Sequence, residues 1–395
     1  MEQRERQVVV AGHLCLDLLP TFAQDHQQKF SEMFVPGKLI NVGESVLSSG
    51  GAVSNTGIAL QQLGLTVKLM GKIGEDLFGK GVQDVLAPYK ESLKLIVDPT
   101  ASTSYSYVIA PPGMDRIFLH HPGANDTFCV DDLDFDQISQ ADLFHFGYPP
   151  LMRRMYCDKG IELSDIMRLV KERHVTTSLD LALPDPESAA GRADWRQILL
   201  RTLPYTDIFF PSIEEILFML DRPAYESITE KVNATGISFI DAYGMDHLTD
   251  LSDRILEMGC SILVIKLGKK GLYIRTGTAC KLADIGHAAP ADPSEWAEKT
   301  WFAPSYFVEQ VVSTAGAGDA SIAGVLSGLL SGQSSNCSLQ LGCAAAAQKI
   351  QIRKSFGGID PLSELLVKLE TWKQEDIEGI PENWTYDIEK CIWKA

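Results

Sequence analysis

Short apolar runs that alternate with helical stretches restrict the fold of this chain more than any other feature. The first run, at residues 8–11, is entirely apolar, as expected for a strand buried on both faces of a parallel sheet. Further strands are predicted at residues 66–70, 143–146, 175–181, 207–210, 262–267 and 271–275. Helices are predicted between strands at residues 53–63, 161–172 and 195–200, and from residue 213 onward. Because strands joined by helices imply right-handed crossovers, the pattern predicts an α/β fold, a doubly wound αβα sandwich.

A strand-like alternation replaces this pattern between residues 93 and 119. Side chains alternate between two faces over residues 104–109, the turn sequence Pro111-Pro112-Gly113 follows, and residues 116–119 resume the alternation. This arrangement predicts a β-hairpin. Together with another strand-like stretch at residues 34–42, the hairpin is expected to form a small sheet outside the main sandwich.

The domain limits follow from these patterns. One main domain is expected at residues 1–370, with the small sheet formed by segments at about 15–49 and 100–125. A C-terminal extension is expected at residues 371–395. The least regular stretches, at residues 223–249 and 279–304, are expected to be insertions.

Charge and cysteine spacing exclude several classes of protein. Lys and Arg total 35 against 52 Asp and Glu, and the net charge of -17 disfavours nucleic acid or an anionic membrane as the main partner. We find neither a secretion signal nor an apolar stretch of transmembrane length. The eight cysteines show no paired short spacing typical of zinc sites or disulfide frameworks, so a cytoplasmic location with reduced thiols is expected.

The strongest local motif is the sequence STAGAGD at residues 313–319, which precedes a long run of small and apolar residues. Small residues at a helix start expose backbone N–H groups at its positive end, so Gly316, Ala317 and Gly318 are predicted to hold an anion. Asp319 would lie in the first turn, where its carboxylate could accept the proton of a bound hydroxyl. Alternatively, the glycines only allow close packing and Asp319 is a helix cap.

A second motif, GGAVSNTG at residues 50–57, places a double glycine and an amide at another predicted helix start. Gly50 and Gly51 permit close approach of a ligand to the backbone, and Asn55 can both donate to and accept from hydroxyl groups. A tight turn with Asn55 as a local cap is the alternative. Asp17 follows the first predicted strand, at the edge where ligands of parallel sheets bind.

The two motifs together resemble the signature stretches of the ribokinase family, also called the PfkB carbohydrate kinases. The resemblance covers nearly the whole chain and includes Asp17, GAN at residues 123–125, Asp180, PSIEE at residues 211–215 and LGKKG at residues 267–271. It implies a ribokinase-like fold in which a small β-sheet lid covers the acceptor pocket. It also implies ATP-dependent phosphorylation of a hydroxyl on a sugar-like molecule.

The resemblance also assigns roles to individual residues. Asp319 becomes the general base and Gly316, Ala317 and Gly318 become the anion hole. The acceptor would be bound by Asp17, Gly50, Gly51 and Asn55. Glu215 would organise Mg²⁺, largely through water. The nucleotide would be bound by Ser212, Lys266, Gly268, Gly271 and Ala346. Pairing of two lids into a homodimer is expected as well.

Two residues depart from the family pattern. Ser313 replaces an Asp that in many members helps to bind an activating monovalent cation, so K⁺ activation is not predicted. Ser212 replaces an Asn and supplies a shorter polar group to the Mg²⁺ and triphosphate network. These departures leave a non-catalytic sugar or nucleotide sensor as an alternative function. A nucleoside kinase is the other alternative. Lys269 and Lys270 are expected to lie in a solvated turn.

Overall fold

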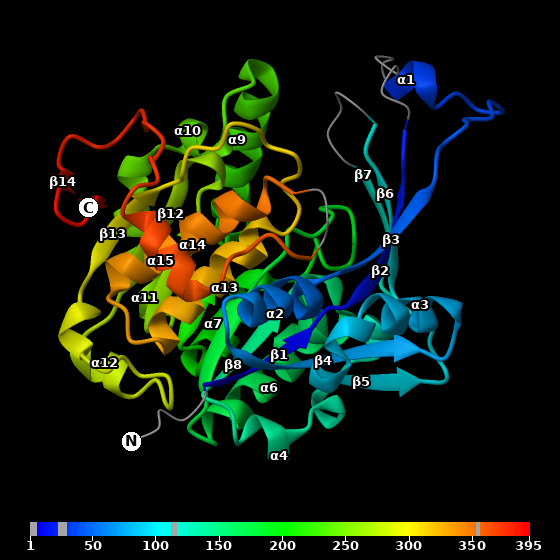
Figure 1. Ribbon diagram of the computed structural model, residues 1–395, viewed down its shortest axis with the longest axis horizontal. Coiled ribbons are helices and arrows are strands. Elements are labelled where there is room, and N and C mark those ends of the chain that lie inside the picture. Colours follow the sequence, from blue (N-terminus) through cyan, green and yellow to red (C-terminus); the bar gives the residue numbers. More distant parts are fainter. Residues whose placement is uncertain (1–5, 23–29, 112–116, 353–355) are drawn as a thin grey trace.

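An eleven-stranded sheet forms the centre of the computed structural model, which describes residues 6–22, 30–111, 117–352 and 356–395 (Figure 1). Its strand order is β14-β15-β13-β12-β11-β10-β9-β8-β1-β4-β5. In chain order these strands are β1 (Gln7–Gly12), β4 (Thr66–Gly74), β5 (Leu93–Asp98), β8 (Leu143–Gly147), β9 (Thr176–Asp180), β10 (Ile208–Phe210), β11 (Ile262–Lys266), β12 (Gly271–Thr276), β13 (Thr300–Pro304), β14 (Thr385–Asp387) and β15 (Ile392–Lys394).

The sheet is parallel from β5 to β11 and antiparallel from β11 to β14. Successive side chains of β1 point to opposite faces, so Val8 and Val10 enter one hydrophobic core and Val9 and Ala11 the other. All four are fully buried. The predicted α/β sandwich, with helices on both faces of a mainly parallel sheet, is therefore confirmed.

Helices cover both faces of this sheet. The face of Val8 is covered by α2 (Ala52–Gln62), α3 (Leu77–Val85), α12 (Ala279–Ala283), α13 (Ala317–Leu330), α14 (Ser335–Lys349) and α15 (Leu362–Leu369). The opposite face is covered by α4 (Phe135–Ile138), α5 (Arg153–Tyr156), α6 (Ile161–Lys171), α7 (Trp195–Thr202), α8 (Ile213–Leu220), α9 (Arg222–Thr235), α10 (Phe239–Tyr243) and α11 (Leu248–Glu257).

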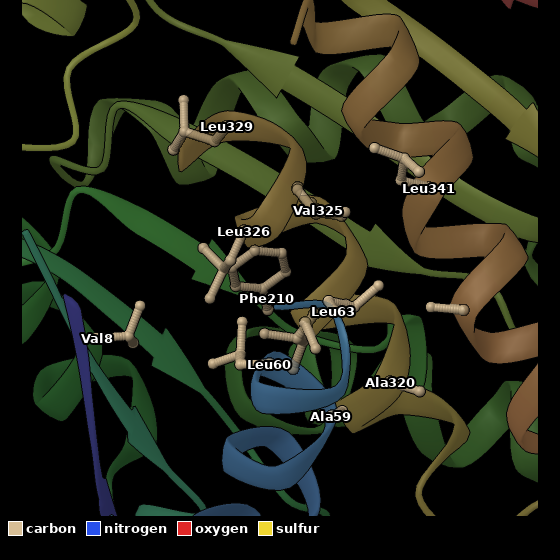
Figure 2. Close-up of a cluster of buried hydrophobic side chains, with 14 of the residues drawn as sticks. Val8, Ala59, Leu60, Leu63, Phe210, Ala320, Val325, Leu326, Leu329 and Leu341 are labelled. Carbon is tan, nitrogen blue, oxygen red and sulfur yellow. The ribbon is translucent and has the colours of Figure 1, made fainter. Parts of the chain in front are cut away.

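The packing of α13 between α2 and α14 positions the main motif. Figure 2 shows Leu60 of α2 and Leu63, the C-cap of that helix, gathered with Leu326 of α13 near Phe210 of the sheet, all within one hydrophobic core. On its other side α13 approaches α14 so closely that a Cβ at Gly324 would lie 2.4 Å from the Leu341 carbonyl oxygen. Only glycine fits there, so the small residues of this helix serve packing as well.

A four-stranded sheet extends from one end of the main sheet, with α1 (Phe30–Met33) beyond its far end (Figure 1). Its strand order is β3-β2-β6-β7, with bounds β2 (Cys15–Pro20), β3 (Ser45–Gly50), β6 (Tyr105–Ile109) and β7 (Ile117–His121). The predicted hairpin is present as β6 and β7, whereas its turn residues 112–116 lie outside the described residues.

The strand predicted at residues 34–42 is wrong, because β3 begins only at Ser45. Residues 36 and 37 form a turn in which Gly37 has a φ of 81°, a conformation that interrupts an extended strand. The lid therefore contains the predicted hairpin, but its remaining strands come from residues on either side of the predicted stretch.

The stretches predicted as irregular insertions contain regular elements. Pro223 lies in the first turn of α9 after the N-cap Asp221, a position where proline begins a helix rather than breaking one. Residues 300–304 form β13, whose Trp301 and Phe302 are buried. The C-terminal extension adds β14 and β15 beside β13. None of the described helices is long and apolar enough to cross a bilayer.

Candidate active site

The carboxylate of Asp319 is buried in the first turn of α13, where three side chains bind it. Its Oδ1 accepts a hydrogen bond from Thr56 Oγ1 at 2.8 Å. Its Oδ2 accepts from the Tyr148 hydroxyl at 2.7 Å and from Asn55 Nδ2 at 3.2 Å. Burial and the neighbouring Asp319 carboxylate raise the pKa of the Tyr148 phenol, so Tyr148 stays protonated as the donor. These bonds satisfy a buried charge and hold the carboxylate in one orientation.

The helix start beside Asp319 has the geometry of an anion site. Gly316 is the N-cap of α13 with a φ of 72°, in the left-handed region that glycine adopts without strain. The Ala317 amide donates to the Thr314 carbonyl at 3.3 Å, whereas the next two amides, of Gly318 and Asp319, lie in the first turn and have no acceptor within the helix. The positive end of α13 therefore offers backbone donors to a phosphate.

Lys266, at the end of β11, places an ammonium group next to this helix start. Its Nζ lies 2.6 Å from Asp180 Oδ1 and 3.7 Å from Glu215 Oε2. The same Nζ would lie 3.8 Å from a Cβ placed at Gly318, so Lys266 is close to the helix start. Burial lowers the pKa of Lys266, but the carboxylates of Asp180, Glu215 and Asp319 together raise it above its ordinary value. Lys266 is therefore charged and can stabilise phosphate oxygens.

Ser212 and Glu215 form a capping box at the start of α8. The Glu215 amide donates to Ser212 Oγ at 3.1 Å, and the Ser212 amide donates to Glu215 Oε2 at 2.6 Å. The described residues contain no group of three or more His, Cys, Asp or Glu side chains that could hold a metal ion by themselves. Asp180 and Glu215 nevertheless fit Mg²⁺, which keeps several waters and needs only one or two carboxylates besides substrate phosphates.

A cavity of about 710 Å³ opens beside α13 and α14. Of the residues predicted to bind a nucleotide, Lys266, Gly268, Gly271 and Ala346 line it, together with Ala317 and Gly318 of the predicted anion hole. Ser212 is not among its lining residues. The volume lies within the range of sites for cofactors and other small ligands, and the cavity reaches the helix start where the phosphates would bind.

Asp17 lies on β2, in a row of polar residues across the small sheet. Ser48 and Ser106 are its neighbours on the adjacent strands, and His120 continues the row. Burial raises the pKa of Asp17 to about 6, against the opposing effect of hydrogen bonds from Cys15 and Ser106. A Cβ at Gly50 would lie 2.3 Å from Asp17 Oδ2, so glycine is needed there to leave room for the carboxylate.

Gly51 is the N-cap of α2 and has a φ of 93°, and a Cβ there would lie 2.3 Å from the His13 carbonyl oxygen. The His13 ring contacts the lid, because its Nε2 lies 3.4 Å from Nε2 of His120. Burial lowers the pKa of both rings, that of His120 to about 4, so both are neutral. Within the described part of the chain, the buried Nδ1 of His13 has no hydrogen-bond partner.

The structure thus brings together the two glycine-rich helix starts, because Asn55 of one motif binds Asp319 of the other. Sequence reasoning missed Tyr148, His13 and Lys349. Lys349 lies beside Gly316, because a Cβ placed at Gly316 would be 3.2 Å from Lys349 Cε. Tyr148 and His13 each follow a strand that ends in glycine, at the carboxyl edge of the sheet. That position could have identified these two residues.

An αβα sandwich with a small sheet beside it, in which a buried carboxylate lies at a helix start next to a cavity, has the architecture of a small-molecule kinase. More specifically, the chain belongs to the pfkB family of carbohydrate kinases, whose family model matches residues 6–355.

Curated relatives agree with this membership. An uncharacterized sugar kinase of Archaeoglobus fulgidus is 26% identical over 297 residues, which cover 74% of this chain and 95% of the relative. The 2-dehydro-3-deoxygluconokinase of Bacillus subtilis is 26% identical over 81% of this chain and 87% of its own length. Fructokinase-1 of Zea mays is 24% identical over 84% of this chain and 85% of its own length.

Solved structures show the same fold. The ribokinase of Arabidopsis thaliana complexed with ribose and ATP gives a TM-score of 0.66 at 18% identity, covering 93% of this chain and 99% of that one. The nucleoside kinase of Methanocaldococcus jannaschii gives a TM-score of 0.61 at 18% identity, covering 92% of this chain and 98% of that one. The ribokinase-like fold expected from the sequence is confirmed.

Proposed function

We propose that this carbohydrate kinase transfers the γ-phosphoryl group of ATP to a hydroxyl of a sugar or sugar-like acceptor, with Asp319 as the general base. The observation that carries the proposal is the Asp319 carboxylate, buried and oriented by three side chains in the first turn of α13. The same helix start supplies amide donors and opens onto the 710 Å³ cavity. Relatives named fructokinase and 2-dehydro-3-deoxygluconokinase support a sugar-like acceptor.

Positioning and charge stabilisation account for most of the rate of phosphoryl transfer, so each part of the site has a defined task. Asp17 and Asn55 hold acceptor hydroxyls, with Gly50 and Gly51 leaving room for them. Asp319 accepts the proton of the attacking hydroxyl. The helix start at residues 316–318 stabilises the charge on the transferred group.

ATP would occupy the cavity lined by Gly268, Gly271 and Ala346, with its phosphates toward Lys266. Mg²⁺, held by Glu215 and Asp180 largely through water, would neutralise part of the phosphate charge. We do not expect K⁺ to activate the enzyme, because Ser313 offers a hydroxyl in place of a carboxylate.

A coupled assay of ADP release tests the function, with sugars, sugar acids, sugar phosphates, nucleosides and polyols as acceptors, with Mg²⁺ and with or without K⁺. We expect Mg²⁺-dependent ADP release with at least one sugar-like acceptor. Release with nucleosides alone would identify a nucleoside kinase instead. Ligand binding without ADP release under any acceptor would favour the sensor, the alternative that Ser212 and Ser313 raise.

Asp17 should make both stability and acceptor binding depend on pH. A carboxyl group whose pKa is raised from 3.8 to about 6 stabilises the fold below pH 4, and this contribution is lost as the pH rises through 6. Between pH 4 and pH 7, the free energy of unfolding of the wild type should therefore fall relative to that of Asp17→Asn by on the order of 2 kcal/mol. Urea unfolding at several pH values measures this difference.

The same variant should raise the KM of the acceptor and leave the KM of ATP unchanged, because Asp17 lies on the lid, away from the nucleotide cavity. Asp131→Asn, which alters an exposed carboxylate, serves as the control and should show neither effect. Parallel pH profiles for Asp17→Asn and the wild type would contradict the assignment of the raised pKa.

We also propose that two copies pair through their lids. Six apolar side chains of the small sheet are exposed: Val46, Leu47, Tyr107, Ile117, Phe118 and Leu119. Leu47, Tyr107 and Leu119 lie in one row across the strands and so share one face of the small sheet. An exposed apolar face of this kind is typical of an interaction surface. Sedimentation equilibrium should give a dimer for the wild type and a monomer for a Leu47→Lys/Leu119→Lys variant; a wild-type monomer would contradict the pairing.

The proposed setting is the cytoplasm, with small molecules rather than nucleic acid as partners. All eight cysteines lie in the described part of the chain and are unpaired there, as a reducing compartment would keep them. The net charge of -17 argues against a nucleic-acid surface.

A further inference from the structure

The C-terminal extension forms one side of the cavity assigned to the nucleotide. Its residues Glu375, Asp376, Ile377 and Glu378 line the cavity together with the start of α13 and the last turns of α14. The family model ends at residue 355, so this part of the wall lies outside the segment that the chain shares with its family. This part of the wall is therefore formed by residues beyond the segment that the family model matches.

Backbone pairing fixes the beginning of the extension against the segment after β13. The Glu375 amide donates to the Ser305 carbonyl at 2.8 Å, and the Phe307 amide donates to the Lys373 carbonyl at 2.9 Å. The Trp372 indole nitrogen donates to the Phe307 carbonyl at 2.8 Å, and its ring packs on Tyr306. These contacts hold residues 375–378 in a defined position beside the cavity.

The end of the extension is anchored in the main sheet, where it is drawn in red beside β13 in Figure 1. Trp384 is buried and stacks with Tyr273, and Ile392 is fully buried. Deleting the extension would expose this part of the core, so substitutions at single positions are the appropriate test.

Lys270 links the extension to two other segments. Its ammonium lies 2.6 Å from Asp241 Oδ1 on α10 and donates to the Glu378 carbonyl at 2.6 Å. Lys270 is only 6% exposed, so the prediction of a solvated turn is wrong for this residue. A buried ammonium needs such partners, which explains why this turn, α10 and the extension meet at one point.

The charges that line the cavity differ between its two sides. Lys266 and the amides at Gly318 favour phosphates at the start of α13. On the other side Glu375, Asp376 and Glu378 line the cavity with Ile377. Lys269 and Lys270 also line it, but the Lys270 ammonium is paired with Asp241 and the Glu378 carbonyl. Because carboxylates repel phosphates, the segment at residues 375–378 suits the uncharged part of a nucleotide, where carboxylates can accept hydrogen bonds from hydroxyl or amino groups.

We propose that residues 375–378 are a nucleoside-recognition element, in which Ile377 packs against the nucleoside of the phosphoryl donor. The proposal rests on the proposed use of ATP by this site. The extension thereby selects a nucleoside triphosphate over a donor that consists of phosphates alone.

Ile377→Ala tests the proposal through equilibrium binding of ATP and of inorganic tripolyphosphate, measured by titration calorimetry. Loss of apolar contact should weaken ATP binding about five- to tenfold, while tripolyphosphate binding stays within about twofold of the wild type. Ile388→Ala removes the same atoms from the same extension, at a residue that is 80% exposed and does not line the cavity, and should change neither affinity.

Unchanged ATP affinity in Ile377→Ala would overturn the proposal, as would an equal loss of affinity for both ligands. Melting temperatures of the two variants identify any loss of folding. The assay measures binding, so it is independent of the acceptor. A wild-type protein that fails to bind ATP would count against the proposed function. A protein that binds ATP equally well with and without the Ile377 side chain would count against this inference alone.

Discussion

Asp319→Asn is expected to reduce kcat for phosphoryl transfer about 10²- to 10⁴-fold, the usual contribution of a general base. The amide keeps the size of the carboxylate, but only its oxygen can still accept a hydrogen bond from α2, and it cannot take up the proton of the attacking hydroxyl. ATP should bind within about twofold of the wild type, because the cavity lining does not include Asp319. ADP release in the presence of the best acceptor and calorimetric titration of ATP measure the two quantities.

Asp142→Asn is a matched control for this prediction. Asp142 is also a buried carboxylate, but it binds Arg6 near the opposite end of β8, away from the proposed site. Its replacement should leave kcat unchanged. If Asp319→Asn retained full turnover, or if both variants lost turnover equally, Asp319 would not be the base.

Lys266→Met is expected to lower both stability and ATP affinity. It removes the ammonium that pairs with the buried Asp180 carboxylate and the partly buried Glu215 carboxylate, and an unpaired buried charge costs about 3–5 kcal/mol. ATP binding should weaken by more than about tenfold, because a charge-assisted contact with phosphate is lost. Urea unfolding and ATP titration at pH 7 measure the two effects.

The double variant Lys266→Met/Asp180→Asn separates these effects. Neutralising Asp180 relieves the unpaired charge, so most of the lost stability should return, whereas ATP affinity should stay low. Recovery of ATP affinity along with stability would show that Lys266 has only a structural role.

The sequence alone predicted the features that depend on neighbouring residues. The alternation of apolar strands and helices identified the αβα sandwich, because burial on both faces imposes a local pattern. Gly51 and Gly316 do begin helices, as their motifs indicated, since a helix start depends on the few residues around it. The misplaced lid strand had a local cause as well, the turn at Gly37.

Only the tertiary structure decided which side chains meet. Asp319 binds Thr56 and Tyr148, which lie 263 and 171 positions away, and no local pattern encodes such pairings. The same holds for Lys270, which binds Glu378 at a separation of 108 positions and so attaches the C-terminal extension beside the cavity at α13 and α14. Secondary structure follows from short-range periodicity, whereas these contacts follow from the order of the strands and the packing of helices, which depend on the whole chain at once.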